Sequence, residues 1–431
     1  MNTRAIPSLR QIEFLNWEFG VFFHFGIRSF YPGHKDWDNL PMDAAAFNPD
    51  RLDCEQWIRA SREAGARYAI LVCKHHDGFA NWPTKYSDYS VAATPWKDGK
   101  GDVVREFVDA CRKYDVKVGL YYSPAQWGGQ TAFAEGREYD DYFINQISEL
   151  LTNYGKIDYL WFDGCGSEGH EYDRARIIQA IRGLQPDILI FQMWDPDTRW
   201  VGNEDGYAPL RNVNLCDEVD FSMMTEERER MDQMRYLPAE CDCKMRSTWF
   251  DCEPNEDTIK EVDELVGMYE MSVGRGANFL LNIGPDCHGR LPEPDLKRLK
   301  ALGREIRRRY GAPIPAFGGM QPEGNGAWSI CTEHFSEDWE NEDTCPQLVN
   351  RVVIEEDLMA QSPVEEFRIY AHLPGYRSKR VCVYKGDTVG HKAICAFPTI
   401  RTAKLTMEAC GKGAPVLTGM RAYYVRPENG N

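Results

Sequence analysis

The sequence predicts an α/β protein in which a (β/α)8-like barrel, a TIM barrel, is followed by a C-terminal antiparallel β-sandwich. Three observations favour this fold class. The chain of 431 residues is too long for one ordinary core and suits a barrel of about 250 residues plus a smaller domain. As far as Arg309, short apolar runs alternate with amphipathic helical patterns, which indicates βα units. Beyond that point, short and partly alternating segments separated by turns are typical of a sandwich.

The predicted barrel strands are short apolar runs. They are Phe19–Ile27, Tyr68–Cys73, Val116–Tyr122, Ile157–Phe162, Ile188–Phe191 and Phe279–Ile283. Residues at helical spacing lie between these runs, for example in Ala175–Leu184 and Thr258–Val273. Helices that alternate with strands in this way predict a parallel sheet.

Cap residues mark two of the predicted helices. Asp53 precedes a segment that carries Trp57 and Ile58, and Asp102 precedes a second segment of the same kind. Aspartate side chains accept hydrogen bonds from the first N–H groups of a helix. Gly65 is a natural end for the first helix, because glycine adopts the left-handed conformation that closes many helices.

The domain boundary is predicted from a change in composition after Arg309. The stretch YGAPIPAFGGMQPEGNGA is rich in Pro and Gly and is typical of a linker or surface crossing. We therefore predict a barrel domain at residues 1–312 and a sandwich domain at residues 313–431. The expected sandwich strands are Val364–Leu373, Arg380–Tyr384, Ala393–Phe397, Ala403–Ala409 and Gly419–Val425.

Composition excludes several classes of partner. A formal net charge of −17 gives no general attraction for nucleic acid or anionic lipid, so neither nucleic acid nor a membrane is an expected partner. The N-terminal segment lacks the apolar run of a signal peptide, and no stretch approaches the roughly 18 apolar residues of a membrane span. A cytoplasmic location is expected, with a secreted form left open. None of the 14 cysteines forms a CxxC pair, which favours reduced thiols over a zinc site.

Polar side chains gather where the predicted barrel strands end, which is where barrel enzymes carry their catalytic groups. These residues are His24, Lys74, His75, His76, Asp77, Tyr121, Tyr122, Trp161, Asp163, Asn282 and Asp286. Adjacent residues of a strand point to opposite faces, so His75 and His76 are not expected to share one metal ion. Hydrogen bonding to a polar ligand is the favoured role for the histidines.

Asp163 in the motif WFDG is the candidate nucleophile. A carboxylate before a glycine turn can also serve only as a local cap. The histidines and aromatic residues at equivalent strand ends favour chemistry on a sugar, whose apolar face packs on aromatic rings. Such chemistry needs a second, protonated carboxyl group. The candidates are Glu168, Glu204, Asp205, Glu240 and Asp242, and spacing alone does not choose among them.

Several motifs in one order resemble glycoside hydrolase family 29, the α-L-fucosidases. They are FGVFFHFG with His24, the pair Asp36-Trp37, KHHDGFANWPTKYSDYSV, GLYYS, WFDG and GRGANFLLNIGPDCHGRLP. The resemblance covers about residues 14 to 310. The stretches RWVGNEDGYA and LPAECD, together with the sandwich, resemble the branch that cleaves α-1,3- and α-1,4-linked fucose.

The resemblance implies a role for individual residues. Asp163 matches the nucleophile and Glu204 the acid/base, with Glu240 as the alternative acid/base. Arg246 is either a contact for the aglycone or a partner of a carboxylate, and Trp249 or Phe250 is the expected wall for the fucose methyl group. Positions that match fucose contacts are His24, Asp36, Trp37, His75, His76, Tyr121 and Trp161. Asp36 departs from the family, where many members carry glutamate, so its contact with a sugar hydroxyl is less secure.

The resulting expectation is a retaining exo-α-L-fucosidase that acts on Lewis-type glycans and needs no metal or organic cofactor. Its two catalytic carboxyl groups are expected to lie about 5–5.5 Å apart. One alternative is a fucose-binding barrel without catalytic activity. Another is a metal-dependent hydrolase that uses His24, His75 and Asp163. The natural glycan, the competition between hydrolysis and transfer, the role of the sandwich and the oligomeric state stay open.

Overall fold

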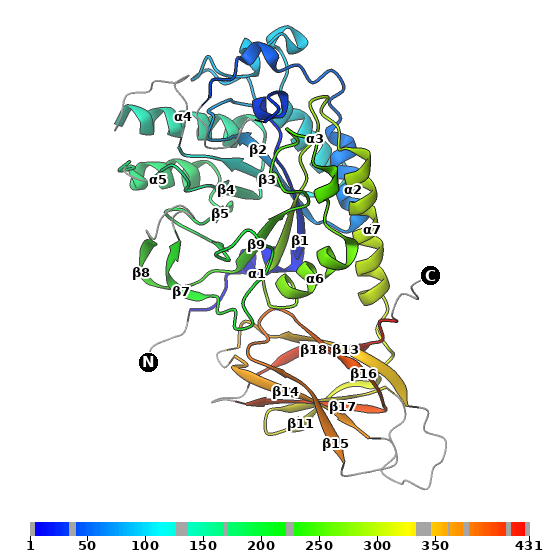
Figure 1. Cartoon of the computed structure of the whole chain (residues 1–431). Coiled ribbons are helices and arrows are strands. Elements are labelled where there is room, and N and C mark those ends of the chain that lie inside the picture. Colours follow the sequence, from blue (N-terminus) through cyan, green and yellow to red (C-terminus); the bar gives the residue numbers. More distant parts are fainter. Residues whose placement is uncertain are drawn as a thin grey trace.

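The structure is a computed structural model that describes residues 5–33, 40–125, 137–167, 170–220, 228–332, 346–360, 363–373, 379–410 and 415–426. Figure 1 shows that these residues form two parts, an α/β barrel above and antiparallel sheets below it. The predicted fold class is confirmed. Among the described helices, none combines the length and apolar character needed to cross a membrane.

The barrel is one sheet of eight strands in the order β5-β4-β3-β2-β1-β10-β9-β6. Each neighbouring pair is parallel, and a parallel bridge between Phe191 and Thr198 brings the two edges of the sheet together. The strands are β1 (Phe19–Phe23), β2 (Tyr68–Lys74), β3 (Lys117–Tyr122), β4 (Tyr159–Phe162), β5 (Leu189–Phe191), β6 (Arg199–Trp200), β9 (Ala239–Lys244) and β10 (Asn278–Asn282).

Helices surround most of this sheet. They are α2 (Cys54–Ala64), α3 (Val103–Lys113), α4 (Arg137–Asn153), α5 (Arg174–Leu184), α6 (Val262–Ser272) and α7 (Glu293–Tyr310). Between β6 and β9 the described chain forms an antiparallel hairpin of β7 (Leu215–Asp220) and β8 (Arg228–Tyr236) instead of a helix. The predicted caps are confirmed, since Asp53 accepts from the Gln56 amide at 2.9 Å and Gly65 has φ of 107°.

Two predicted elements of the barrel differ by four residues from the sequence pattern at one end. Strand β1 ends at Phe23, so His24 follows the strand, and Ile27–Phe30 forms a short 3-10 helix. The amide of Asn81 donates to the Phe25 carbonyl at 2.6 Å and holds the chain where it leaves the sheet. The helix predicted from Thr258 begins at Val262.

The N-terminal helix α1 (Leu9–Trp17) closes one end of the barrel. Ser8 forms a capping box with Gln11 at its start. The Phe14 ring lies 5.3 Å from Tyr159 and 6.0 Å from Tyr68, which begin β4 and β2. Aromatic residues fill the interior from this helix towards Trp161. The opposite end of the barrel, where the strands finish, is therefore the place for a site.

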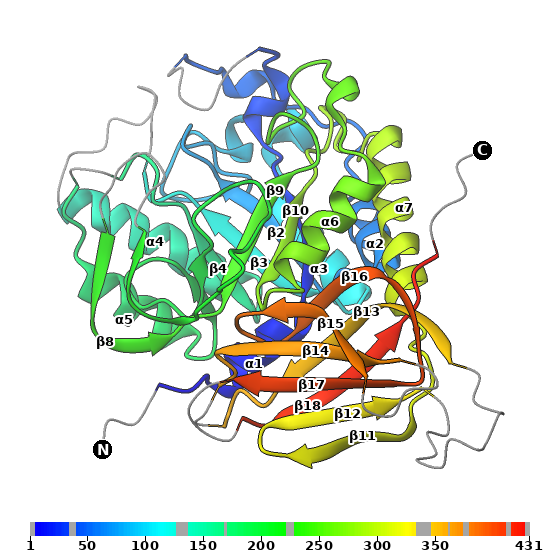
Figure 2. The same ribbon diagram turned by 60° about the horizontal axis from the view of Figure 1, so that its bottom comes forward.

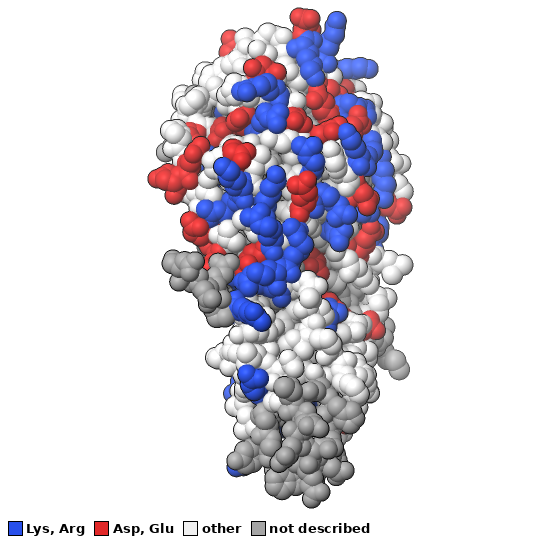
Figure 3. Space-filling view, turned by 90° about the vertical axis from the view of Figure 1, so that its right-hand side faces the viewer, with Lys and Arg blue, Asp and Glu red and all other residues white. Residues whose placement is uncertain are grey.

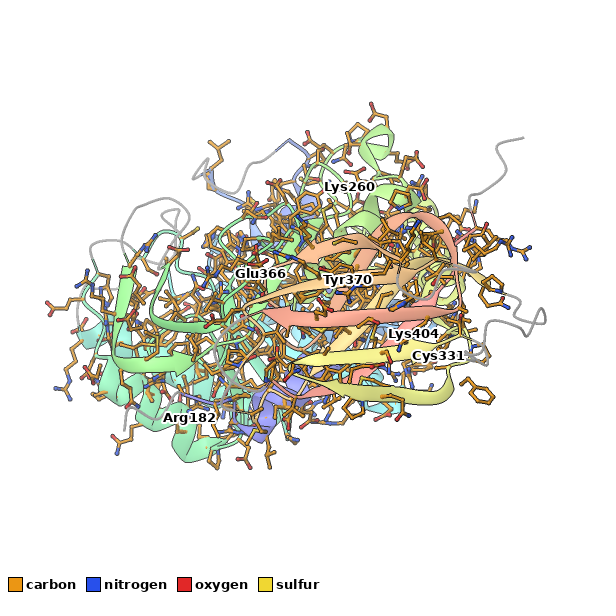
Figure 4. All side chains as sticks on the ribbon, turned by 90° about the horizontal axis from the view of Figure 1, so that it is seen from below. Arg182, Lys260, Cys331, Glu366, Tyr370 and Lys404 are labelled. Atoms are coloured by element: carbon orange, nitrogen blue, oxygen red, sulfur yellow. The ribbon has the colours of Figure 1, made fainter. Side chains whose placement is uncertain are left out.

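The C-terminal part is a sandwich of two antiparallel sheets, seen in Figure 2. The larger sheet has the order β11 (Phe317–Gly324), β12 (Ala327–Cys331), β17 (Lys404–Cys410), β14 (Glu366–His372) and β15 (Arg380–Gly386). The smaller has the order β16 (Ala393–Thr402), β13 (Gln347–Glu356) and β18 (Leu417–Tyr423). Figure 4, seen from below, shows Tyr370 and Lys404 on the larger sheet and Arg182 away from it on the barrel.

The sandwich contacts the barrel through both backbone and charge. The Ile394 amide donates to the Gly274 carbonyl at 3.1 Å, and Lys392 pairs with Glu18. Figure 3 shows acidic and basic side chains together over the barrel helices on the side of α2 and α7. Many are paired along α7, as Arg308 and Arg309 are with Glu305. This face of the barrel thus carries charges of both signs.

Candidate active site

The carboxyl ends of β4, β5 and β6 surround a pocket. Three carboxyl groups line it, those of Asp163, Glu204 and Asp242. Aromatic residues form much of the remaining wall. The lining residues are Trp161, Phe162, Asp163, Gly164, Cys165, Phe191, Gln192, Trp200, Glu204 and Asp242. This pocket combines carboxyl groups with the apolar faces of aromatic rings, and a site that binds and cleaves a sugar needs both.

Asp163 is held as an ionised carboxylate directly after β4. The Tyr121 hydroxyl donates to its Oδ2 at 2.8 Å, and the Cys165 amide donates to its Oδ1 at 2.9 Å. The Nε2 atom of His76 lies 3.4 Å from Oδ2. Burial alone would raise the pKa of Asp163, but His76 and these hydrogen bonds outweigh it and lower the pKa to about 2. An anion at this position is suited to nucleophilic attack.

His76 is anchored on its far side by Ser123, which ends the motif GLYYS. The two side chains are linked at 2.6 Å between Nδ1 and Oγ. The Ser123 hydroxyl also donates to the Ala125 carbonyl at 3.0 Å. Ser123 is not among the predicted site residues, although its place directly after a predicted strand is a usable signal. The contact directs Nε2 of His76 towards Asp163.

The prediction that the adjacent histidines His75 and His76 point to opposite faces of a strand is wrong. Their ring centroids are 4.3 Å apart, and His75 stacks on Tyr121 at 5.7 Å while His76 faces Asp163. The reason is that β2 ends at Lys74, so strand alternation no longer applies to the two residues. Among the residues that the structure describes, no group of three or more His, Cys, Asp or Glu side chains is arranged to hold a metal ion.

His24 lies in an aromatic cluster beside these groups. Its ring is 4.8 Å from Trp249 and 5.3 Å from Phe250, and His75 lies 5.1 Å from Phe250. Burial lowers the pKa of His24 to about 3 and the pKa of His75 well below its ordinary value. Both imidazoles are therefore neutral at physiological pH. Neutral rings can exchange hydrogen bonds with hydroxyl groups without bringing a charge into the site.

Trp161 forms the floor of the pocket and is fixed from three sides. It stacks on Phe191 at 4.1 Å and on Tyr121 at 5.4 Å. Its Nε1 donates to Glu240 at 2.8 Å. Glu240 is 1% exposed and also accepts from the hydroxyls of Tyr68 and Tyr159 at 2.6 and 3.3 Å. The described contacts of Glu240 thus lie inside the barrel, beneath the pocket.

Burial raises the pKa of Glu240 to about 7, and this shift predicts a pH-dependent stability. Between its ordinary pKa of about 4.5 and pH 7 the folded protein binds a proton that the unfolded chain releases, so stability falls as the pH rises through this range. We expect Glu240→Gln to remove this loss. Its stability relative to the wild type should rise by about 2 kcal/mol between pH 5 and pH 8.

Chemical denaturation at the two pH values measures this change. Exposed Glu366 on the sandwich, replaced by Gln, is the matched control and should show no comparable change with pH. A constant difference between Glu240→Gln and the wild type at both pH values would contradict the assignment.

Glu204 lies in the loop after β6 and lines the same pocket as Asp163. Its Oε2 pairs with Lys244 at 3.1 Å. Asp242 lies nearby, where burial and the charge of Glu204 raise its pKa well above the ordinary value. The Trp200 indole donates to Asp242 at 2.8 Å. Asp205, by contrast, is exposed and does not line this pocket.

Arg246 adopts the second of its two predicted roles. Its Nε donates to both oxygens of Asp295 at 2.9 and 3.1 Å, and its Nη1 lies 3.3 Å from Asp251 and 3.2 Å from Asn255. The guanidinium therefore fixes the loop that carries Trp249 and Phe250, and a contact with substrate stays a prediction. Asp36, Trp37 and Glu168 lie outside the described residues.

Two residues near the pocket were not singled out from the sequence. Gln192 has φ of 68°, a left-handed conformation that is uncommon for a non-glycine residue and often marks a functional site. Its Oε1 accepts from the Trp200 amide at 2.8 Å and so fixes the start of the loop that leads to Glu204. Trp200 belongs to a strand of two residues, too short for a periodic signal.

Known proteins share both the barrel and the complete fold. A family model described as Alpha-L-fucosidase matches residues 31–309, more than half of the chain. Alpha-L-fucosidase 1 of Arabidopsis thaliana is 29% identical over 94% of this chain and 84% of its own length. A glycoside hydrolase 29 family member from an unknown rumen bacterium is 31% identical, with a TM-score of 0.85 over 99% of this chain and 79% of its own. A Bacteroides ovatus structure is also 31% identical, with a TM-score of 0.85 over 100% of this chain and 76% of its own.

The family match spans the strand ends that carry His75, Tyr121, Asp163 and Glu204. The similarity to solved structures extends through the sandwich as well. Together with the carboxyl-lined pocket, these matches establish that the chain belongs to glycoside hydrolase family 29, the α-L-fucosidases, and is a glycoside hydrolase.

Proposed function

We propose that this enzyme is a retaining exo-α-L-fucosidase that releases terminal α-1,3- or α-1,4-linked L-fucose from Lewis-type oligosaccharides or glycoconjugates. One observation carries the proposal. Asp163, whose pKa is lowered to about 2, and Glu204 line the same aromatic pocket. An ionised carboxylate and a second carboxyl group facing one cavity are the two parts that a glycosidase needs, and the retaining outcome rests on the resemblance to glycoside hydrolase family 29.

In the proposed reaction, an oxygen of Asp163 attacks the anomeric carbon while the bond from that carbon to the leaving oxygen breaks. Glu204 donates its proton to the leaving oxygen, and a fucosyl ester of Asp163 forms. Water then attacks the anomeric carbon and gives a proton to Glu204, and the Asp163 carboxylate is released. Two inversions leave the α configuration unchanged.

Substrate recognition follows from the walls of the site. Trp161 and its neighbour Phe191 offer apolar rings to one face of the sugar. The neutral imidazoles of His24 and His75 suit hydroxyl groups, and Trp249 or Phe250 suits the methyl group that distinguishes fucose. The preference for α-1,3 and α-1,4 linkages rests on the resemblance of the Glu204 loop to that branch of the family.

Fucose release from two substrates tests this proposal. The purified protein is incubated with a Lewis-type trisaccharide and, separately, with an α-1,2-fucosylated disaccharide, each with and without a chelator. Release from the branched substrate alone, unchanged by the chelator, is expected. Release from both substrates would overturn the narrow linkage preference. Binding of fucose without any turnover would instead favour the inactive binder, and loss of activity with the chelator would favour the metal-dependent hydrolase.

The low pKa of Asp163 predicts where activity fails in acid. With a pKa of about 2, the carboxylate stays ionised through the mildly acidic range, so its protonation does not limit activity above about pH 3. Replacing His76 by Gln removes the main group that lowers this pKa. We expect the acid limb of kcat/KM to move up by about 1–2 pH units in that variant.

Profiles of kcat/KM between pH 2 and pH 7 measure this shift. Tyr121→Phe is the matched comparison, because it removes one hydrogen bond to Asp163 and keeps the aromatic ring, so a smaller shift in the same direction is expected. An acid limb that stays in place in both variants would show that Asp163 does not govern it.

A further inference from the structure

Asn282 joins three parts of the barrel at one buried point. It is 1% exposed and ends β10, in register with Phe22 of β1. Its Nδ2 donates to the Trp249 carbonyl at 2.7 Å, and its Oδ1 lies 2.7 Å from Nδ1 of His24. One amide therefore contacts both the histidine that follows β1 and the loop that carries the aromatic wall.

These contacts determine which atom of His24 carries its proton. A carbonyl oxygen only accepts hydrogen bonds, so the group that faces the Trp249 carbonyl must be the amide nitrogen of Asn282. The amide oxygen must then face His24, and it can bond to Nδ1 only if Nδ1 carries a hydrogen. Because burial lowers the pKa of His24 to about 3, the ring holds one proton, and Nε2 is left with a free lone pair.

The charged groups around His24 oppose one another. Asp163, after β4, favours the protonated imidazole, whereas His76, after β2, and Lys244, at the end of β9, disfavour it. The nearby rings of Phe22, His75, Tyr121, Trp249 and Phe250 surround the imidazole at centroid distances of 4.4–5.9 Å. Among the described contacts of His24, the hydrogen bond that its Nδ1–H donates to Asn282 is the one that distinguishes the two ring nitrogens.

We infer that Asn282 is a positioning residue that presents Nε2 of His24 to the substrate as a hydrogen-bond acceptor and holds Trp249 in place through the same amide. A substrate hydroxyl at Nε2 must then donate the hydrogen bond. The Asn282 amide thus determines that His24 accepts and the substrate donates at this position. The part of the inference that concerns the substrate rests on the proposed function. The proton position on His24 does not.

The replacement Asn282→Asp tests the inference with little change in size. A carboxylate beside Nδ1 favours the doubly protonated imidazole, which cannot accept a hydrogen bond at Nε2. When the pH is lowered from 8 to 5, kcat/KM of the variant should fall. We expect this fall to be about tenfold larger than the fall of the wild-type kcat/KM over the same range. Asn278→Asp is the matched control, because Asn278 lies four residues earlier on the same strand and donates to the Phe14 carbonyl beneath the barrel.

Nitrogen-15 NMR of histidine-labelled protein reports the proton on His24 directly, with the His24→Gln variant used to identify the signal. The wild type should carry the proton on Nδ1 throughout pH 5–8. Asn282→Asp should gain a second proton on His24 as the pH falls, and Asn278→Asp should resemble the wild type. A wild-type signal with the proton on Nε2, or an Asn282→Asp profile identical to that of Asn278→Asp, would overturn the inference.

The proposed function and the role of Asn282 can fail separately. If the enzyme releases no fucose, the proposed function is lost, while the NMR measurement on the wild type still tests the role of Asn282. If fucose is released but His24 carries its proton on Nε2, the inference fails and the proposed function stands.

Discussion

Replacing Asp163 by alanine is expected to lower kcat for an aryl α-L-fucoside by at least about 1000-fold, because the variant has no group to form the covalent intermediate. The pocket around the missing carboxylate should persist, since Trp161 is held by Phe191 and Glu240 and not by Asp163. Binding of fucose should therefore survive the loss of turnover. Steady-state kinetics and calorimetric binding of fucose measure the two effects.

A control at the other end of β4 separates chemistry from stability. Asp158 precedes β4 at the far end of the barrel and accepts from the Val118 amide at 3.0 Å. Asp158→Ala removes a carboxylate from the scaffold but leaves the pocket intact, so kcat should stay near the wild-type value. Azide should partly restore turnover in Asp163→Ala by entering the vacated space as an external nucleophile. A rate for Asp163→Ala close to that of the wild type would sink the assignment.

The second large effect is expected for Glu204→Ala. Loss of a general acid costs about 10²–10⁴-fold when the leaving oxygen needs a proton. The rate of fucose release from an oligosaccharide should fall by this amount. For an aryl fucoside with an acidic phenol as leaving group, the rate of forming the fucosyl-enzyme should fall much less, because the phenolate leaves without a proton. Rates for a series of aryl fucosides of increasing phenol pKa, set beside the oligosaccharide, measure the dependence.

Two neighbouring carboxyl groups provide the controls for Glu204. Glu240→Gln keeps an acceptor for the Trp161 indole, and Asp242→Asn keeps one for the Trp200 indole. Neither variant should acquire the dependence on the leaving group that Glu204→Ala shows. If Glu240→Gln shows that dependence and Glu204→Ala does not, the acid/base role belongs to Glu240.

Much of the site can be predicted from the sequence because strand order along the chain implies a common edge. His24, His75, Tyr121 and Asp163 each follow or end a strong apolar run, and parallel strands bring their carboxyl ends together. The capping residues Asp53 and Asp102 are recognisable for a local reason, since each bonds to an amide three residues away. Such contacts need no knowledge of the tertiary fold.

The choice between Glu204 and Glu240 could not be made in this way. Strand β6 has two residues, and β9 reads AECDCK, with polar side chains that face the barrel interior. Neither gives a clear apolar period. Glu240 is buried at the start of β9 because Tyr68, Tyr159 and Trp161 supply three donors from other strands. Only the closed barrel brings those donors together, so the tertiary structure is needed to see that Glu240 does not line the pocket.

Arg246 and Asn282 illustrate the same limit. Each is a polar residue near a strand end, which is equally typical of a ligand contact and of a structural contact. The structure places Asp295, from the start of α7, against Arg246, and it places the Trp249 carbonyl against Asn282. These partners lie 49 and 33 residues away along the chain. No local pattern connects them.

The central claim is that Asp163 forms a covalent bond to fucose, and trapping that intermediate tests it most directly. A 2-deoxy-2-fluoro-α-L-fucosyl fluoride reacts with a retaining enzyme at the nucleophile. Fluorine at C2 slows both attachment and release of the sugar, whereas the fluoride leaving group speeds attachment alone, so the covalent intermediate accumulates. Digestion and mass spectrometry then locate the label. We predict one fluorofucosyl group on Asp163. A label on another carboxylate, or turnover without any label, would contradict this account.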